Sequence, residues 1–188
     1  MARSVGLTRE RVVSVAAELA DTHGLDQLAL ARVAARLGVR IPSLYNHVDG
    51  LAGLRRELAL LGVRRLTDQL SRAAIGRAGD EAVVAIAGAY RAFVLAHPGL
   101  YAATIHAPDP DDAELHAASR ATIEVVVTVL AHFRLGDAGT IHAVRGLRAL
   151  VHGFATLEAA GGFGLPLDRD ESFARLVRAF IAGLHTNP

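Results

Sequence analysis

The chain has 188 residues, which is enough for one compact domain or for two small ones that share a core. It contains no cysteine, so disulfides and thiolate metal sites are excluded, and no run of about 18 apolar residues predicts a membrane-spanning helix. The N-terminal residues are charged and lack the apolar segment of a secretion signal, so we expect a cytoplasmic protein.

The basic residues other than histidine are all arginine, and they are unevenly distributed. Residues 1–77 contain 12 arginines and 7 acidic residues, whereas residues 78–188 contain 8 arginines and 12 acidic residues. This asymmetry hints at a nucleic-acid partner for the first half, although chance scatter explains a difference of this size about as well. Aromatic residues make up only 5% of the chain, and a core of Ala, Leu and Val favours helices over sheets.

Local signals divide the first part of the chain into four helices. Thr8 is suited to cap the first of them, and Gly24 and Gly38 stand where a glycine commonly ends a helix. Pro42 is tolerated at the start of a helix but not inside one, so a new helix begins at residue 41 or 42. The predicted helices cover about residues 9–23, 30–37, 41–48 and 51–75.

The remainder of the chain also shows helical periodicity, and no alternating strand pattern occurs anywhere. Glycine, proline and aspartate separate the segments. The predicted helices cover about residues 80–96, 111–133, 137–160 and 170–185, with a short helical segment at 100–107. The sequence therefore predicts an all-α fold of about nine helices.

The two short helices at 30–37 and 41–48 are joined by a three-residue turn that begins with Gly38, which predicts a helix-turn-helix. Leu44 and Val48 are expected to face inward. Ser43, Tyr45, Asn46 and His47 then face outward, and these side chains suit contacts to phosphates and base edges. An ordinary helical hairpin remains the alternative, because helical hairpins are common.

Within about residues 7–58, this part of the chain resembles the N-terminal domain of the TetR family of bacterial transcriptional regulators. The resemblance rests on the glycine turn and on the Leu-Tyr-x-His run that follows it. The matching residues are Ala34, Gly38, Val39, Leu44, Tyr45, His47 and Leu54. The resemblance implies a three-helix DNA-binding domain, which we place at residues 1–50.

Three positions depart from the family pattern: Val48 replaces the usual Phe, Leu51 the usual Lys, and Ala29 a frequent Thr or Ser. The missing lysine and hydroxyl remove two phosphate contacts, which Arg40, Arg55 or Arg56 can replace through bidentate geometry. Combining the resemblance with the exposed positions, we assign DNA contact to Arg40, Pro42, Ser43, Tyr45, Asn46, His47 and Arg55.

Residues 147–166 resemble the so-called WHG type of TetR C-terminal domain, named for a Trp and a His-Gly pair. His152 and Gly153 match the pair, but the chain contains no tryptophan. The resemblance implies that residues 51–188 bind a small effector and form a homodimer.

Isolated polar residues within the apolar helices predict a small-molecule pocket, since such sites are apolar with a few polar groups. The alternative is a closed core whose polar groups are satisfied. The candidate effector-binding residues are Tyr90, Tyr101, Thr104, His106, Thr122 and His152.

Small residues near position 150 and an apolar side of the last helix predict a four-helix bundle with a second copy of the chain. One such apolar helix on a small domain would otherwise leave a large exposed patch. The candidate interface residues are Gly146, Ala149, Gly153, Phe173, Val177, Phe180 and Ile181.

His106, Asp109, Asp111 and His116 support an alternative reading as a hard-metal site, and with it an all-α enzyme or a small-molecule-binding protein. The simpler interpretation is a solvated turn followed by acidic helix caps. No Ser-His-Asp arrangement or phosphate loop is present, so we expect no catalytic residues and no cofactor.

The prediction is a dimeric repressor that an effector releases from a palindromic operator.

Overall fold

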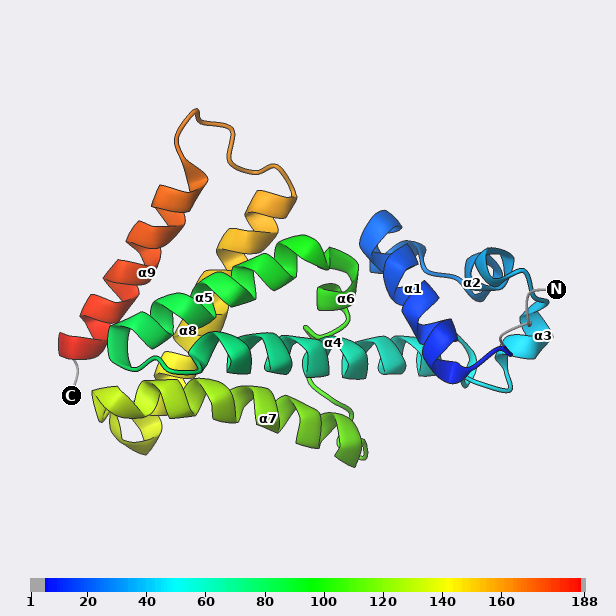
Figure 1. The fold of residues 1–188 in the computed structure, drawn as a ribbon, viewed down its shortest axis with the longest axis horizontal. Helices are drawn as coiled ribbons and strands as arrows, with labels where there is room; N and C mark the ends of the chain where they lie inside the picture. The colour runs from blue at the N-terminus through cyan, green and yellow to red at the C-terminus, as the bar shows by residue number, and fades with distance from the viewer. Residues whose placement is uncertain (1–5, 187–188) are drawn as a thin grey trace. The chain divides into compact units, whose positions relative to one another are not determined.

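The computed structural model describes residues 6–186, and within this range all regular structure is helical (Figure 1). This confirms the predicted all-α fold and its approximate number of helices. The helices are α1 (Arg9–His23), α2 (Leu30–Leu37), α3 (Ile41–Leu44), α4 (Gly50–Ala74), α5 (Gly79–Ala96), α6 (Pro98–Ala102), α7 (Ala113–Leu130), α8 (Gly136–Ala159) and α9 (Arg169–Thr186), with 3₁₀ turns η1 (Leu25–Gln27) and η2 (Ala131–Phe133).

The predicted start and stop signals act as expected in the first helices. The Thr8 hydroxyl caps α1 by accepting a hydrogen bond from the Arg11 N–H at 3.2 Å. Gly38 ends α2 in the left-handed conformation, with φ of 68°, which a glycine adopts without steric cost. Pro42 lies in the first turn of α3, where its missing N–H has no partner to lose.

The helix predicted at 41–48 is shorter than expected, and this is a correction. α3 ends at Leu44, and the chain makes one further turn in which the N–H groups of His47 and Val48 both bond to the Leu44 carbonyl, at 2.9 and 3.0 Å. Gly50 then adopts φ of 67° and begins α4. The polar residues after Leu44 are therefore presented by a turn.

The described chain divides into two compact units. Unit 1 comprises the residues up to Gly62 together with His97–Asp109, and unit 2 comprises Val63–Ala96 and the residues from Pro110 onward. α4 contributes to both units, and α6 belongs to unit 1. Within unit 1, α6 packs on α1.

α6 packs very closely against α1 in unit 1. A Cβ atom added to Gly99 would lie 2.0 Å from the carbonyl carbon of Ala20, so only glycine fits at this position. The Asp21 carboxylate accepts the Leu100 N–H at 2.8 Å and lies 2.9 Å from the His97 ring nitrogen Nδ1. Leu100 is fully buried, and it anchors α6 in the core of unit 1.

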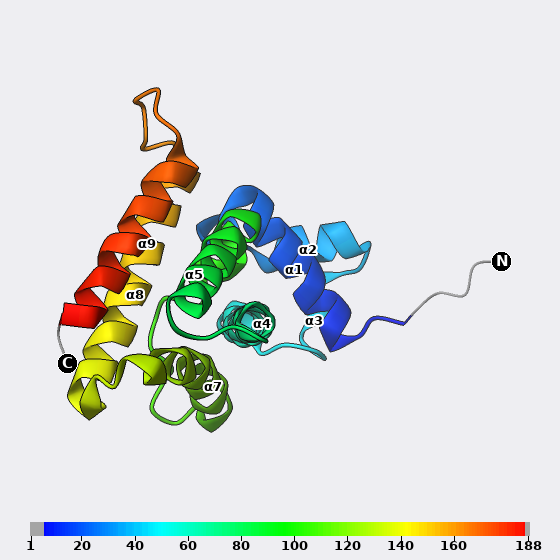
Figure 2. The same cartoon turned by 60° about the vertical axis from the view of Figure 1, so that its left-hand side comes forward.

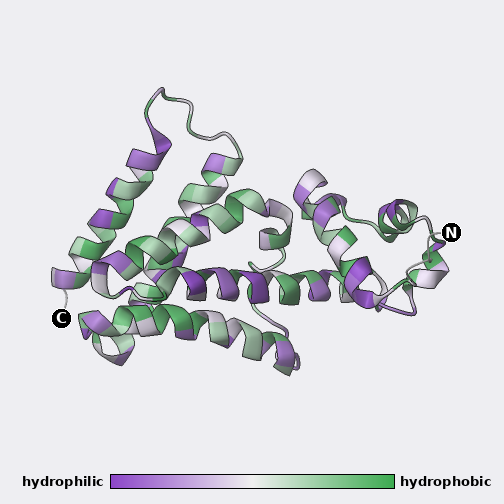
Figure 3. Cartoon of the chain, viewed as in Figure 1, coloured by the Kyte–Doolittle hydropathy of each residue, from purple (hydrophilic) through white to green (hydrophobic). Residues whose placement is uncertain are grey.

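Unit 2 is built around α5, which packs against α7, α8 and α9. The helices α8 and α9 run side by side, as Figures 1 and 2 both show. In Figure 3 the hydropathy changes repeatedly along α4, the pattern of a helix that is buried on one side. In the described part of the chain, no helix is long and apolar enough to cross a membrane.

Arg91 connects three helices of unit 2. It bonds twice to Glu158 of α8, with Nε–Oε2 and Nη2–Oε1 distances of 2.7 Å, and Nη1 lies 2.7 Å from Asp170 of α9. Its guanidinium carbon lies 5.3 Å from the ring centroid of Phe154 and 4.9 Å from that of Phe173. The hydrogen bonds between the two charged groups raise the pKa of Arg91 and lower the pKa of Glu158.

Candidate nucleic-acid interface

The helix-turn-helix of unit 1 presents a polar surface on a buried apolar base. Leu44 is fully buried and Val48 is 5% exposed, as predicted, and they fix the segment to the core. Tyr45 is 58% exposed, Asn46 is exposed, and His47 is partly exposed. The side chains that suit phosphate and base contact therefore point outward from a rigid support.

The other predicted DNA-binding residues lie around the same segment. Arg40 and Pro42 are exposed and Ser43 is partly exposed at the beginning of α3. Arg55 is exposed, but its guanidinium reaches the Leu25 carbonyl of η1 at 3.5 Å, the outer limit of a hydrogen bond.

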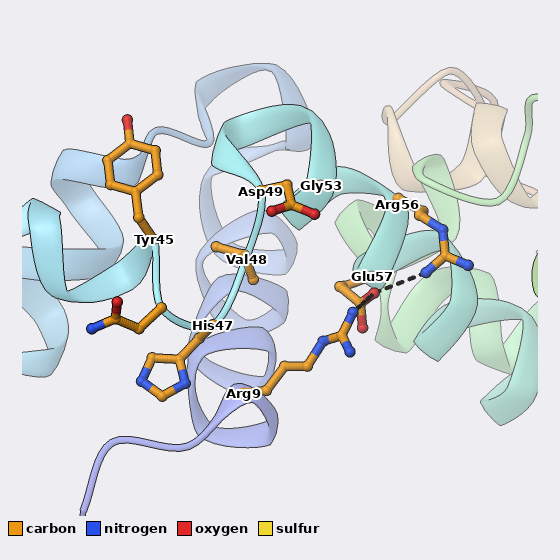
Figure 4. Close-up of a pocket in the computed structure, with 9 residues that line it drawn as sticks. Arg9, Tyr45, His47, Val48, Asp49, Gly53, Arg56 and Glu57 are labelled. Carbon is orange, nitrogen blue, oxygen red and sulfur yellow. Dashed lines mark hydrogen bonds and ion pairs between the residues drawn. The ribbon is translucent and has the colours of Figure 1, made fainter.

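A hollow of about 370 Å³ opens beside this surface, between the first residue of α1 and the first turns of α4 (Figure 4). Arginine, histidine, tyrosine and asparagine supply hydrogen-bond donors to it, and Asp49 and Glu57 supply negative charge. The lining residues are Arg9, Tyr45, Asn46, His47, Val48, Asp49, Gly53, Arg56 and Glu57.

Two arginines in this hollow share one carboxylate oxygen. Oε1 of Glu57 lies 2.5 Å from Nη2 of Arg9 and 3.0 Å from Nη1 of Arg56 (Figure 4). The sequence interpretation did not assign Arg9 or Glu57 to the interface and mentioned Arg56 only as a substitute for the missing lysine. No local signal indicates the Arg9–Glu57 contact, because the two residues are 48 positions apart in the chain.

The predicted effector-binding residues are divided between the two units. Tyr90, Thr122 and His152 lie in unit 2 on α5, α7 and α8, and the Thr122 hydroxyl lies 2.6 Å from that of Thr67 on α4. The other three, Tyr101, Thr104 and His106, belong to unit 1.

The candidate metal cluster is not assembled in the structure. His106 and Asp109 belong to unit 1, whereas Asp111 and His116 belong to unit 2. Among residues 6–186, no group of three histidine, aspartate or glutamate side chains could hold a metal ion.

The predicted interface residues on α8 and α9 have different surroundings. Phe173, Val177 and Ile181 are buried within unit 2, with exposed fractions of 6%, 3% and 6%. Phe180 is half-buried against Gly146, whose added Cβ would lie 3.1 Å from the ring. Ala149 is exposed and Gly153 partly exposed, and further apolar side chains on these two helices are also exposed, namely Ile141, Leu157 and Leu176.

An all-α chain that presents a helix-turn-helix on its surface has the features of a DNA-binding regulator. Residues 83–180 match the family described as Tetracyclin repressor-like, C-terminal domain. The chain is 36% identical over 187 residues to the uncharacterized HTH-type transcriptional regulator YobS of Bacillus subtilis (strain 168), covering 100% of this chain and 97% of that one. This protein belongs to the TetR family of transcriptional regulators.

Other proteins agree with this assignment. The chain is 37% identical over 185 residues to the uncharacterized HTH-type transcriptional regulator Rv0681 of Mycobacterium tuberculosis (strain ATCC 25618 / H37Rv), covering 98% of this chain and 84% of that one. The fold matches that of the transcriptional regulator SCO7222, a TetR from Streptomyces coelicolor, with a TM-score of 0.75, 21% identity and coverage of 96% and 99%. Both curated relatives are described as HTH-type transcriptional regulators.

Proposed function

We propose that this protein is a one-component repressor that binds a palindromic operator as a homodimer and is released by a small-molecule effector in the cytoplasm. The observation that carries the DNA-binding part is the exposed Tyr45-Asn46-His47 turn above the buried Leu44 and Val48. The match of residues 83–180 to a family named for a repressor supports the regulatory part.

Two copies of the helix-turn-helix in a two-fold dimer would enter successive major grooves about one helical turn apart, at roughly 34–36 Å. The exposed residues of α8 and α9 support a dimer formed through these helices. Leu176 is 39% exposed on α9, and on α8 the small residues Ala149 and Gly153 are exposed and partly exposed. Small residues would allow helices of two copies to approach closely.

We place the effector in unit 2 and retain Tyr90, Thr122 and His152 as its contacts. The three helices that carry them pack on one another, with Tyr90 buried and Thr122 and His152 partly exposed. Tyr101, Thr104 and His106 stay candidates whose substitution tests whether α6 and the segment that follows it take part in the response.

Selection from a library of random duplexes tests DNA binding and identifies the operator sequence in the same experiment. The wild type should enrich a palindrome whose half-sites are about 10 base pairs apart. Tyr45→Phe should weaken binding to the selected and to a random duplex by a similar factor, because it removes a hydrogen bond to phosphate; the salt dependence should stay unchanged, because the hydroxyl carries no charge. Thr128→Val is the control, since it removes a hydroxyl from an exposed position of α7 in unit 2 and should leave the affinity unchanged.

The dimer and the effector have separate tests. Leu176→Glu should shift the mass measured by light scattering from dimer to monomer, because a two-fold interface receives the charge twice. Glu171→Gln, on the same helix, should leave the dimer intact.

A thermal-shift screen of lipophilic metabolites and antibiotics should identify compounds that raise the melting temperature and release the selected duplex. If no enriched duplex emerges, or if a monomer binds it with full affinity, the proposal fails.

A further inference from the structure

Glu57 occupies an unusual position for a carboxylate on a DNA-binding surface. Its side chain is only 12% exposed, although it lines the hollow beside Tyr45 and His47. Arg9 and Arg56, which contact the same carboxylate oxygen, are 58% and 34% exposed. The negative charge therefore lies beneath two positive groups that face the solvent.

The geometry constrains where the two guanidinium groups lie. Arg9 is the first residue of α1 and Arg56 lies on α4, so the contact connects the beginnings of two helices. An arginine has five N–H donors, and the contact of Arg9 with Glu57 involves only its Nη2 nitrogen. Arg9 can therefore bond to Glu57 and to a phosphate oxygen at the same time.

Arg9 and Arg56 are the groups of the hollow that can bind a backbone phosphate, and they share the lining with the carboxylates of Asp49 and Glu57. Figure 4 shows the Arg9 and His47 side chains on the side of the hollow formed by α1 and the turn after α3, with Arg56 and Glu57 on α4. Arginine binds phosphate through a planar pair of donors, and the direction of that plane determines which phosphate geometry it accepts. A buried carboxylate that fixes the plane would therefore affect how the protein is positioned on the duplex.

We propose that Glu57 is a positioning residue: it holds Arg9 and Arg56 as a clamp on one backbone phosphate and thereby increases the preference for the operator over other DNA. The inference rests on the proposed DNA-binding function. Glu57 acts in two opposite ways, since its charge weakens the attraction of any phosphate while its hydrogen bonds orient the arginines. The affinity for random DNA depends mainly on the charge, whereas the affinity for the operator depends on both the charge and the orientation of the arginines.

The opposite effects allow a test with Glu57→Gln, which removes the charge and keeps the shape. Affinity for a random 30-base-pair duplex should rise about three- to tenfold, and its salt dependence should steepen by about one unit of log affinity per log salt. Affinity for the duplex selected by the wild type should stay constant or fall, so that the ratio of the two affinities decreases about tenfold. Glu57→Asp, which keeps the charge, should restore part of this ratio.

Glu114→Gln is the matched control, because Glu114 also pairs with an arginine of α4, Arg64, at 2.9 Å, but lies in unit 2. It changes the net charge equally and should leave the ratio unchanged. A second check uses Arg9→Gln: in this background Glu57→Gln should change the ratio less than in the wild type, since one of the two arginines that Glu57 orients is absent. Melting curves establish that each variant is folded.

If Glu57→Gln strengthens binding to both duplexes by the same factor, Glu57 contributes charge alone and the inference is overturned. The same holds if neither affinity changes, or if Glu114→Gln lowers the ratio equally. If Glu57→Gln does not fold, Arg9→Gln decides: an unchanged ratio and salt dependence overturn the clamp. A wild type that selects no duplex refutes the proposed function itself, and the inference falls with it.

Discussion

Replacing Glu158 with glutamine tests the contribution of the buried ion pair that joins α5 to α8. The side chains of Arg91 and Glu158 are 12% and 9% exposed, so solvent screens their interaction weakly. Glutamine keeps one acceptor oxygen but replaces the other by an amide that cannot accept from the guanidinium. The variant therefore loses one hydrogen bond of Arg91 and leaves it with the glutamine oxygen, Asp170 and two aromatic rings as partners.

A hydrogen bond to a charged group contributes about 1.5–3 kcal/mol, and breaking a buried pair without compensation costs about 3–5 kcal/mol. Because Asp170 still neutralises Arg91, we expect the lower range, about 1.5–3 kcal/mol. In a chain of this size the melting temperature should fall by about 3–12 °C. Calorimetry or circular dichroism at one protein concentration measures this shift without interference from association.

Glu171→Gln is the control for this prediction, because Glu171 pairs with Arg175 and Arg178 at the surface, where it is 50% exposed. Such surface pairs contribute about 0–1 kcal/mol, so the melting temperature should change little. A Glu158→Gln protein that melts within 1–2 °C of the wild type (on the order of the effect of a surface pair), or a control with an equal shift, would refute the reasoning.

Three further predictions concern pH and glycine. The folded state lowers the pKa of Glu158 from its ordinary value of 4.5, so on acidification Glu158 takes up a proton in the unfolded chain before it does in the folded chain. The difference in unfolding free energy between the wild type and Glu158→Gln should therefore be complete above about pH 4.5 and should decrease as the pH falls through the lower, folded pKa. Melting curves recorded at a series of acidic pH values measure this difference. Gly99→Ala should destabilise the protein by about 1–3 kcal/mol in urea unfolding, since its Cβ would meet the Ala20 backbone. Gly88→Ala, in the middle of α5 with no atom within 4 Å of the added Cβ, should instead stabilise the protein by about 0.5–1 kcal/mol. A loss of stability in this variant would show that another protein surface packs on this position in solution.

The helix-turn-helix could be predicted because its signals are local. Gly38 and Pro42 define the turn through backbone conformations that each residue type prefers, and the spacing of Leu44 and Val48 indicates the inward face. The length of α3 was not predictable in the same way. Helical spacing continues to Val48, but a single turn and a helix share that spacing, and the structure ends the helix at Leu44.

The sequence alone determined the helical class, the glycine and proline boundaries and the outward polar turn, since each depends on residues within a few positions of one another. Tertiary structure decided which element covers each apolar face and which charges meet. Phe173 and Ile181 show the apolar side of α9 clearly in the sequence, but only packing shows that they are buried within their own unit. The partners Arg9–Glu57 and Arg91–Glu158 are 48 and 67 residues apart, and periodicity within one helix carries no information about which distant helix will lie beside it.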